Sequence, residues 1–228
     1  AALAGVTDAA ASVDTAKAAI LSGGGTGQTF TLTTGVDAGP AFTGGNGNDA
    51  FNVPVGAYLS ALDSINGGGG NDTLNIYGVD AAGAAAAISI PSTATVASIE
   101  TANITGASTV TADVSKWNGL TTLNIAKDVG NGSITAATTT AVSVAAHTGG
   151  TLSVTGGLSQ AVTATGGNTT LSGAVGAVTL TQTSQGAANI AVDGGSNVSV
   201  TSSGITATGG TFAVGANKAA TGTVLVNA

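Results

Sequence analysis

Short segments in which apolar and polar residues alternate fill the chain from about residue 101 to residue 228. In order, these segments read ANIT, TLNIA, AVSVAA, TLSVT, AVTAT, AVTLT, NVSVTS, TFAVG and TVLVN. Their starts lie about 8 to 14 residues apart, and Gly-Gly pairs starting at positions 149, 156, 166, 194 and 209 separate several of them. A period of two with many β-branched residues predicts β-strands, because Thr, Val and Gly all disfavour a helix.

The predicted strands are too short for each to supply a face of a β-sandwich. Stacked as successive rungs, however, they hydrogen-bond to the turns above and below and bury an inner column of Val, Ile, Leu and Ala. We therefore predict an all-β fold, a right-handed parallel β-solenoid. A β-sandwich is the alternative, because a strand spacing near ten residues also occurs in sandwiches.

The N-terminal segment 1–28 shows a different pattern. The stretch AALAGVTDAAASVDTAKAAIL places apolar residues at steps of three and four, which predicts a short N-terminal helix that SGGGTG then ends. A single helix of this length is marginally stable in water, so we expect it either to pack on a neighbouring domain or to act as a helical linker. The predicted organisation is this helix with a Gly-rich linker in 1–28, a loop region in 29–100 and a Thr/Ala/Gly-rich solenoid in 101–228.

Charged side chains make up only 7% of the 228 residues, and the net charge is −7, since 11 acids outnumber four Lys. Nucleic-acid and anionic lipid surfaces both require clustered cations, so we expect neither partner. No apolar run approaches the roughly 18 residues that span a bilayer, so we expect no membrane insertion. The segment 1–22 also lacks the basic and apolar parts of a signal peptide, so we expect the chain to begin inside a longer protein.

Two glycine-rich loops in the region 29–100 repeat one nine-residue pattern, GGxGxDxUx, in which U is a large apolar residue. The first loop reads GGNGNDAFN from Gly44, and the second reads GGGGNDTLN from Gly67. This nonapeptide is the calcium-binding repeat of RTX proteins. The predicted metal site therefore contains the following residues of the two loops: Gly44, Gly45, Asn46, Gly47, Asn48, Asp49, Gly67, Gly68, Gly69, Gly70, Asn71 and Asp72.

The chemistry of these loops suits Ca²⁺, which takes 6 to 8 oxygen ligands at about 2.3 to 2.6 Å. Glycines let the backbone turn tightly enough to aim several carbonyls at one point, and Asp49 and Asp72 would add charged ligands. Asp63 lies four positions before the second Gly-Gly, and Asp37 lies three residues before the matching place in the first loop, so both are further expected ligands. Two other acids, Asp80 and Glu100, are further candidate ligands, although each fits a solvated acid at a strand end better.

Five stretches carry a family resemblance: FTLTTGVD, FTGGNGNDAFN, LDSINGGGGNDTLNI, VASIETANIT and NIAVDGGSNVSVTSSGIT. They resemble bacterial RTX-type S-layer and large secreted surface proteins, of the Caulobacter S-layer type. The resemblance implies RTX-like β-roll loops that lead into an irregular β-helix, and folding outside the cell once calcium binds. It also implies type I secretion, an extracellular cell-surface location, and self-assembly into an S-layer, filament or biofilm matrix. The chain ends in GTVLVNA without an evident secretion signal, so we expect a segment of a longer protein or an atypical member.

The catalytic patterns that accompany RTX repeats elsewhere do not occur in this sequence. A lipase requires GxSxG and a zinc protease requires HExxH, and the chain contains neither pentapeptide and a single histidine, His147. With one His and no Cys or Arg, most acid–base and nucleophilic constellations are excluded. We therefore predict that the protein is not an enzyme.

Two other roles stay open for a solenoid of this composition. An ice-binding face would need aligned T-x-T triplets, such as those at 109–111, 163–165 and 181–183, although Thr is also a common strand residue. A carbohydrate-binding adhesin would need sugar platforms, for which Trp117 and the two tyrosines, Tyr58 and Tyr77, are candidates, although each fits a packing residue or loop anchor better. The expected partner is a further copy of the chain, in a homo-oligomer, lattice or filament, and a cell-surface polysaccharide is the alternative.

Overall fold

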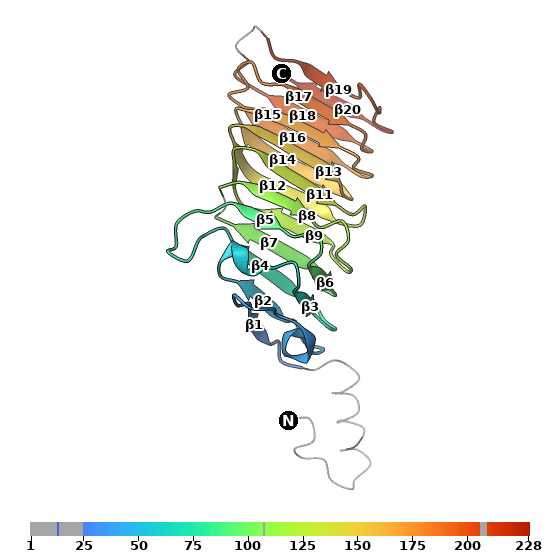
Figure 1. The fold of residues 1–228 in the computed structure, drawn as a ribbon. Helices are drawn as coiled ribbons and strands as arrows, with labels where there is room; N and C mark the ends of the chain where they lie inside the picture. Colours follow the sequence, from blue (N-terminus) through green and yellow to red (C-terminus); the bar gives the residue numbers. More distant parts are fainter. Residues whose placement is uncertain (1–12, 14–24, 107, 206–208) are drawn as a thin grey trace.

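The computed structural model describes residue 13 and residues 25–106, 108–205 and 209–228. Within them, strands stack along one axis into a β-solenoid of about 9 turns (Figure 1). Every pair of named strands is parallel, whereas a β-sandwich pairs its strands antiparallel. The predicted all-β solenoid is therefore confirmed, and the sandwich alternative is wrong. The predicted N-terminal helix lies almost wholly outside the described residues.

Three parallel sheets form the walls of the solenoid. The long sheet contains, in spatial order, β1 (Thr29–Thr31), β2 (Ala50–Val53), β4 (Thr73–Tyr77), β7 (Thr101–Thr105), β9 (Thr122–Ile125), β12 (Ala141–Thr148), β14 (Ser159–Thr165), β16 (Val178–Thr183), β18 (Val198–Ser202) and β20 (Val224–Asn227), with β10 (Asp128–Val129) beside β12. The facing sheet contains β5 (Ile88–Ile90), β8 (Val110–Asp113), β11 (Gly132–Ala136), β13 (Thr151–Gly156), β15 (Asn168–Ser172), β17 (Ile190–Asp193) and β19 (Phe212–Val214). The short sheet contains β3 (Ser64–Asn66) and β6 (Thr95–Ala97).

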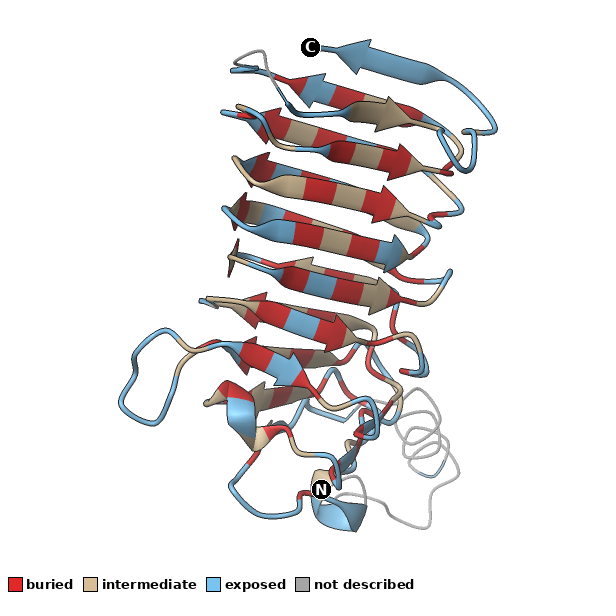
Figure 2. Cartoon of the chain, turned by 45° about the horizontal axis from the view of Figure 1, so that its top comes forward, coloured by how far each residue is buried: buried red, intermediate tan, exposed pale blue. Residues whose placement is uncertain are grey.

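The core consists of columns of aliphatic side chains that run along the solenoid axis. Alternation along each strand turns every second side chain inward, which Figure 2 shows as bands of buried residues. The strand register then places equivalent side chains of successive turns above one another, so that each is covered by its neighbours. One buried column of the long sheet contains Leu32, Val53, Ile76, Ile104, Ile125, Val144, Val162, Leu180 and Val200.

The turns differ in length, which hides the repeat in the sequence. One turn takes 28 residues, from Asp72 to Glu100, whereas a later one takes only 18, from Thr165 to Thr183. From β11 onward, strands of the long sheet and of the facing sheet alternate along the chain. The short spacing between the predicted strands is therefore the spacing of half turns, which explains why it also fits a sandwich.

The first turns contain a third side. Here the short sheet and two 3₁₀ helices, η1 (Gly39–Phe42) and η2 (Gly56–Tyr58), complete the wall. The first glycine-rich loop leads into β2, and the second joins β3 to β4. Both predicted metal loops therefore lie at one corner of the solenoid, where the short sheet gives way to the long sheet. In the described part of the chain, no helix is long and apolar enough to cross a membrane.

Candidate functional site

The two glycine-rich loops stack directly on each other. Gly69 N donates a hydrogen bond of 2.8 Å to Gly45 O, and Asn71 N donates one of 2.9 Å to Asn48 Oδ1. The strands that follow the loops, β2 and β4, are paired in the same register. The two loops predicted from the sequence are therefore the same corner of two successive turns.

The close approach of neighbouring turns explains several glycines of the motif. A Cβ atom on Gly44 would lie 2.1 Å from Gly67 O, and one on Gly67 would lie 1.9 Å from Ser98 O. A side chain at either position would push the turns apart. Gly45 differs, because a Cβ atom there would meet nothing within 4 Å. Part of the motif is therefore required for stacking, whether or not a metal binds.

A column of polar side chains, which we name the acid column, runs through the same corner and contains Gln28, Asp49, Asp72 and Glu100. The backbone N–H groups of Gln28, Asp49 and Asp72 each donate to the carboxylate of the next turn, at 2.6 Å for the first and at 2.7 Å for the other two. Asp49 and Asp72 are buried, and Glu100 is half-buried. Glu100, expected to be a solvated acid, is therefore a member of the site.

Asp37 and Asp63 form a second buried pair in the same turns. Asp63 Oδ1 accepts a hydrogen bond of 3.0 Å from Asp37 N. Their other bonds are local, from the backbone and hydroxyl of Thr33 to Asp37 and from those of Ser60 to Asp63. The two acids thus occupy equivalent positions of successive turns, as their spacing from the loops suggested. Asp80, by contrast, is exposed and caps its own turn, as expected of a solvated acid.

One buried oxygen of the acid column, Asp72 Oδ2, has no hydrogen-bond partner in the described residues. The equivalent oxygen of the first loop, Asp49 Oδ2, accepts from Gly45 N at 2.7 Å. In the second loop, Gly68 N donates instead to an asparagine side chain, at 3.0 Å. Burial raises the pKa of Asp72, and the negative charges of Asp49 and Glu100 raise it further. The ionised form of Asp72 is therefore disfavoured in the fold unless a cation is near.

Calcium would satisfy this oxygen and offset the charge of the acid column. Among the described residues, no three His, Cys, Asp or Glu side chains form a group that could hold a metal by themselves. Ca²⁺ also takes backbone carbonyls, however, and Asp72 Oδ2 and Ser98 O both lie against Gly67, so these two oxygens are close to each other. Asp72 and Glu100, with backbone oxygens beside Gly67, are the residues that fit a calcium ion best. Asp49 fits less well, because both its oxygens already accept backbone N–H groups.

A third glycine loop, at residues 25–28, precedes the two that carry the full nonapeptide. A Cβ atom on Gly27 would lie 1.9 Å from Asn48 O, so this loop stacks as closely as the others. Gln28 takes the place of the aspartate, and β1 then pairs with β2. The sequence pattern had placed these residues in a linker. The signal lay in GTGQTFT, where glycines and a polar residue precede an apolar residue as in the other loops.

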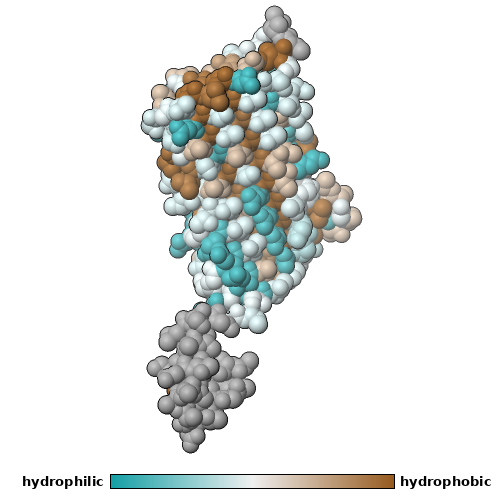
Figure 3. Space-filling view, turned by 180° about the vertical axis from the view of Figure 1, so that it is seen from behind, coloured by the Kyte–Doolittle hydropathy of each residue, from teal (hydrophilic) through white to brown (hydrophobic). Residues whose placement is uncertain are grey.

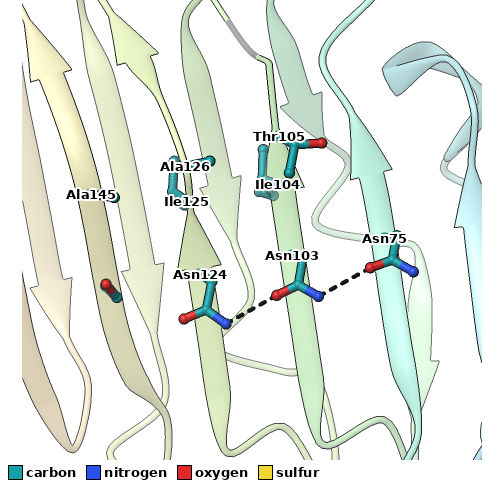
Figure 4. Close-up of a pocket in the computed structure, with 9 residues that line it drawn as sticks. Asn75, Asn103, Ile104, Thr105, Asn124, Ile125, Ala126 and Ala145 are labelled. Carbon is teal, nitrogen blue, oxygen red and sulfur yellow. Dashed lines mark hydrogen bonds between the residues drawn. The ribbon is translucent and has the colours of Figure 1, made fainter.

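A ladder of asparagine amides runs along the outer face of the long sheet, and we name it the Asn ladder. Its members, Asn52, Asn75, Asn103 and Asn124, share one register position in β2, β4, β7 and β9. From Asn75 onward, each Nδ2 donates to the Oδ1 of the preceding turn, at 3.1 Å from Asn75 to Asn52 and at 3.0 Å for the next two pairs. Figure 4 shows these last two bonds. Rows of hydrophilic side chains are visible along this half of the solenoid in Figure 3. The ladder was not predicted from the sequence, and its signal is the recurring triplet of an Asn between two apolar residues: FNV, LNI, ANI and LNI.

The aromatic candidates and the single histidine differ in their exposure. Trp117 is only 6% exposed and Tyr58 packs against the core, so neither offers a platform, whereas Tyr77 is 42% exposed. His147 is fully buried, and its Nδ1 lies 2.7 Å from an oxygen of the equally buried Asp128. No sequence pattern indicates this pair, because the two residues come together only through the pairing of β10 with β12.

The threonine triplets are only partly aligned. Residues 163–165 and 181–183 lie side by side on β14 and β16, but 109–111 belongs to the facing sheet. Two triplets therefore share a face.

Comparisons of the chain with protein-family models, curated proteins and solved structures find no match. The function of the chain is therefore inferred from its own residues.

Proposed function

We propose that this chain is part of a secreted, calcium-dependent structural protein that self-assembles on the bacterial cell surface as an S-layer, filament or biofilm matrix. The observation that carries the proposal is the stack of glycine-rich loops with the acid column, and the edge of the long sheet at β20 offers a surface for assembly. Within the described residues, β20 pairs with β18 alone, and its Val224, Leu225 and Val226 are 48%, 61% and 43% exposed. Hydrophobic side chains also gather near this end of the solenoid in Figure 3. An apolar, uncharged edge strand is a template for a further strand.

The proposed partner of this edge is a neighbouring copy of the chain, and a following part of the same protein is the alternative. Pairing through backbone hydrogen bonds gives a strong junction to a protein with few charges. Such a junction depends little on ion pairs between subunits. Raising the concentration of monovalent salt should therefore disturb assembly little, since salt screens exposed charges rather than backbone hydrogen bonds.

Calcium controls folding in this proposal. The acid column brings three carboxylates into consecutive turns, and no salt bridge to a cation neutralises them in the described residues. An ion that binds only the folded form stabilises it by RT ln(1 + [L]/Kd), about 2.7 kcal/mol at a hundredfold excess over Kd. The later turns stack through their apolar columns and need no metal. Chelation should therefore loosen the first turns before the later ones.

The proposal assigns no catalytic role. A general base or nucleophile must reach its substrate, and the imidazole of His147 is fully buried in the core against Asp128. The carboxylates of the acid column are tied to backbone N–H groups. These contacts suit a structural role for both sets of residues.

Electron microscopy of the purified protein, with and without calcium, tests the proposal. We expect ordered assemblies in calcium, dispersed particles in chelator and little effect of monovalent salt. Leu225→Lys places a charge on the free edge and should prevent assembly, whereas Ala81→Lys, at an exposed position between β4 and β5, should not. A protein that stays dispersed in calcium at high concentration would contradict the proposal. Assemblies that form equally in chelator would contradict the role of calcium.

A further inference from the structure

A groove lies beside the Asn ladder on the outer face of the long sheet (Figure 4). Its volume is about 390 Å³, and three ladder residues, Asn75, Asn103 and Asn124, line it. Small side chains of the neighbouring turns, among them Ser143 and Ala145, form another part of its wall and leave it open. No residue that lines the groove is charged. An occupant would therefore meet amides, hydroxyls and methyl groups alone.

The ladder amides keep hydrogen-bonding capacity for such an occupant. An asparagine side chain can donate two hydrogen bonds and accept two. Within the ladder, Asn75 and Asn103 each donate one bond and accept one, which leaves one N–H and one lone pair on each amide. These free groups repeat at the spacing of neighbouring strands, about 4.7 to 4.9 Å. The groove thus presents a regular row of paired donors and acceptors along the solenoid axis.

An exposed aromatic ring flanks this row. Tyr77 lies two residues after Asn75 on β4, so alternation places both side chains on the outer face, and Tyr77 is 42% exposed. It is partnered in register with Thr105, which lines the groove. Aromatic rings offer an apolar face and, in tyrosine, a hydroxyl that bonds to polar partners. The apolar faces and hydroxyl groups of sugar rings match both features.

We propose that this ladder groove binds an extended, uncharged polysaccharide. Vicinal hydroxyl groups on each sugar would pair with the free N–H and lone pair of one ladder amide, and Tyr77 would contact the apolar face of a ring. An anionic polymer is disfavoured, because no lining residue is a cation. The groove lies on the flank of the solenoid and the β20 edge lies at its end, so this inference stands apart from the proposed self-assembly.

Calorimetric titration with neutral hexasaccharides, cellohexaose and α-1,6-mannohexaose, tests the inference, and a heparin hexasaccharide serves as the anionic comparison. We expect one neutral sugar to bind and heparin not to bind. Ala145→Arg fills the groove from an exposed position without altering the ladder. It should weaken sugar binding at least about tenfold, which corresponds to a loss of about 1.4 kcal/mol in binding free energy. Tyr77→Ser should weaken it by up to about tenfold, the range of one aromatic contact.

Ala187→Arg is the matched control, because it adds the same charge at an exposed alanine outside the groove. It should bind the sugar as the parent does. Several outcomes would overturn the inference: no binding of either neutral sugar at millimolar concentration, equal binding by Ala145→Arg, or tighter binding of heparin. Loss of self-association in Ala145→Arg, without any sugar binding by the parent, would instead identify the groove as a contact between copies of the chain and overturn it as well.

Discussion

The backbone N–H of Asp49 donates a hydrogen bond of 2.7 Å to the carboxylate of Asp72, 23 residues later in the chain. The same bond recurs one turn below, from Gln28 to Asp49, and one turn above, from Asp72 to Glu100. Each acid thus accepts a hydrogen bond from a backbone N–H of the preceding turn. Each also lies near the negatively charged carboxylate of an adjacent turn. The acid column therefore joins the first turns and at the same time creates a need for a cation.

Replacing Asp72 by Asn separates these two effects. The amide keeps an oxygen for Asp49 N, and its NH₂ group replaces the bare oxygen beside Ser98 O. In chelator, we expect D72N to melt at or above the temperature of the parent, because a buried carboxylate repelled by its neighbours is gone. In calcium at a hundredfold excess over Kd, the parent should gain about 2.7 kcal/mol and D72N much less. Scanning calorimetry in both buffers measures these differences.

Asp80→Asn is the control for this experiment, since Asp80 is exposed and lies outside the acid column. It should respond to calcium as the parent does. Equal calcium-induced shifts in the parent and in D72N would show that Asp72 is not a ligand.

A pair of glycine substitutions tests whether the loops need space as well as ligands. Gly67→Ala would place a Cβ atom 1.9 Å from Ser98 O, whereas Gly45→Ala would meet nothing within 4 Å. We expect Gly67→Ala to destabilise the protein by about 1 to 3 kcal/mol, the usual cost of overpacking, and more if the turns separate. Gly45→Ala should change stability by less than about 1 kcal/mol. Thermal melting in chelator, where no metal contributes, compares the two, and equal losses would contradict the close stacking of the turns.

Local patterns in the sequence were sufficient to predict the strands and the two main loops. Alternation acts between residues two apart, and GGxGxD is a contiguous motif, so both are visible without knowledge of the fold. Glu100 was harder to place, because its turn has Ser98 and Ile99 where the other loops have glycines. Its role follows only from the bond to Asp72 N across 28 residues.

The Asn ladder could not be predicted, because it depends on register between turns of unequal length. Insertions such as residues 78–87, between β4 and β5, lengthen one turn without changing the strand pattern. The spacing from Asn75 to Asn103 is 28 residues, but that from Asn103 to Asn124 is 21. No fixed period reveals that these amides align.

Asp193 joins the end of β17 to a later turn and makes stability depend on pH. Its carboxylate accepts bonds of 2.8 Å from the backbone N–H of Asn217 and from its side chain, and one of 3.3 Å from Lys218 N. These bonds, that of the Asn217 backbone above all, lower the pKa of Asp193. A carboxyl group with a lower pKa in the folded state stabilises the fold above its unfolded pKa, 3.8, and loses this contribution as the pH falls through its folded pKa.

Asp193→Ala should therefore lower the melting temperature at neutral pH, by a loss of about 1 kcal/mol for a partly exposed carboxylate. At a pH below the folded pKa of Asp193 the parent should show a smaller advantage over the variant. Asp193→Asn keeps an acceptor for Asn217 N without the charge and should fall between the two at neutral pH. A loss of stability in Asp193→Ala that is the same at both pH values would show that the charge of Asp193 plays no part.

His147 and Asp128 form a fully buried polar pair in the core. Asp128 also accepts a bond of 2.8 Å from Val110 N, so it links the long sheet to the facing sheet. His147→Leu would leave the carboxylate buried without its partner, and we expect a loss of about 3 to 5 kcal/mol in the free energy of unfolding. Thr148→Ala, beside it on the same strand and not fully buried, should change this free energy by less than about 0.5 kcal/mol.

A double variant separates the worth of the pair from the cost of breaking it. Asp128→Asn keeps the oxygen that accepts from Val110 N but removes the negative charge. His147→Leu breaks only the bond to Asp128, because His147 Nε2 has no partner among the described residues. The variant D128N/H147L should therefore be more stable than His147→Leu alone, because no buried charge is left unpaired. Denaturant titrations of the parent, the two single variants and the double variant give the coupling energy. Two results would contradict this account: a loss of unfolding free energy in His147→Leu no larger than that in Thr148→Ala, or a double variant less stable than His147→Leu alone. Either result would show that the pairing of the Asp128 charge does not stabilise this part of the core.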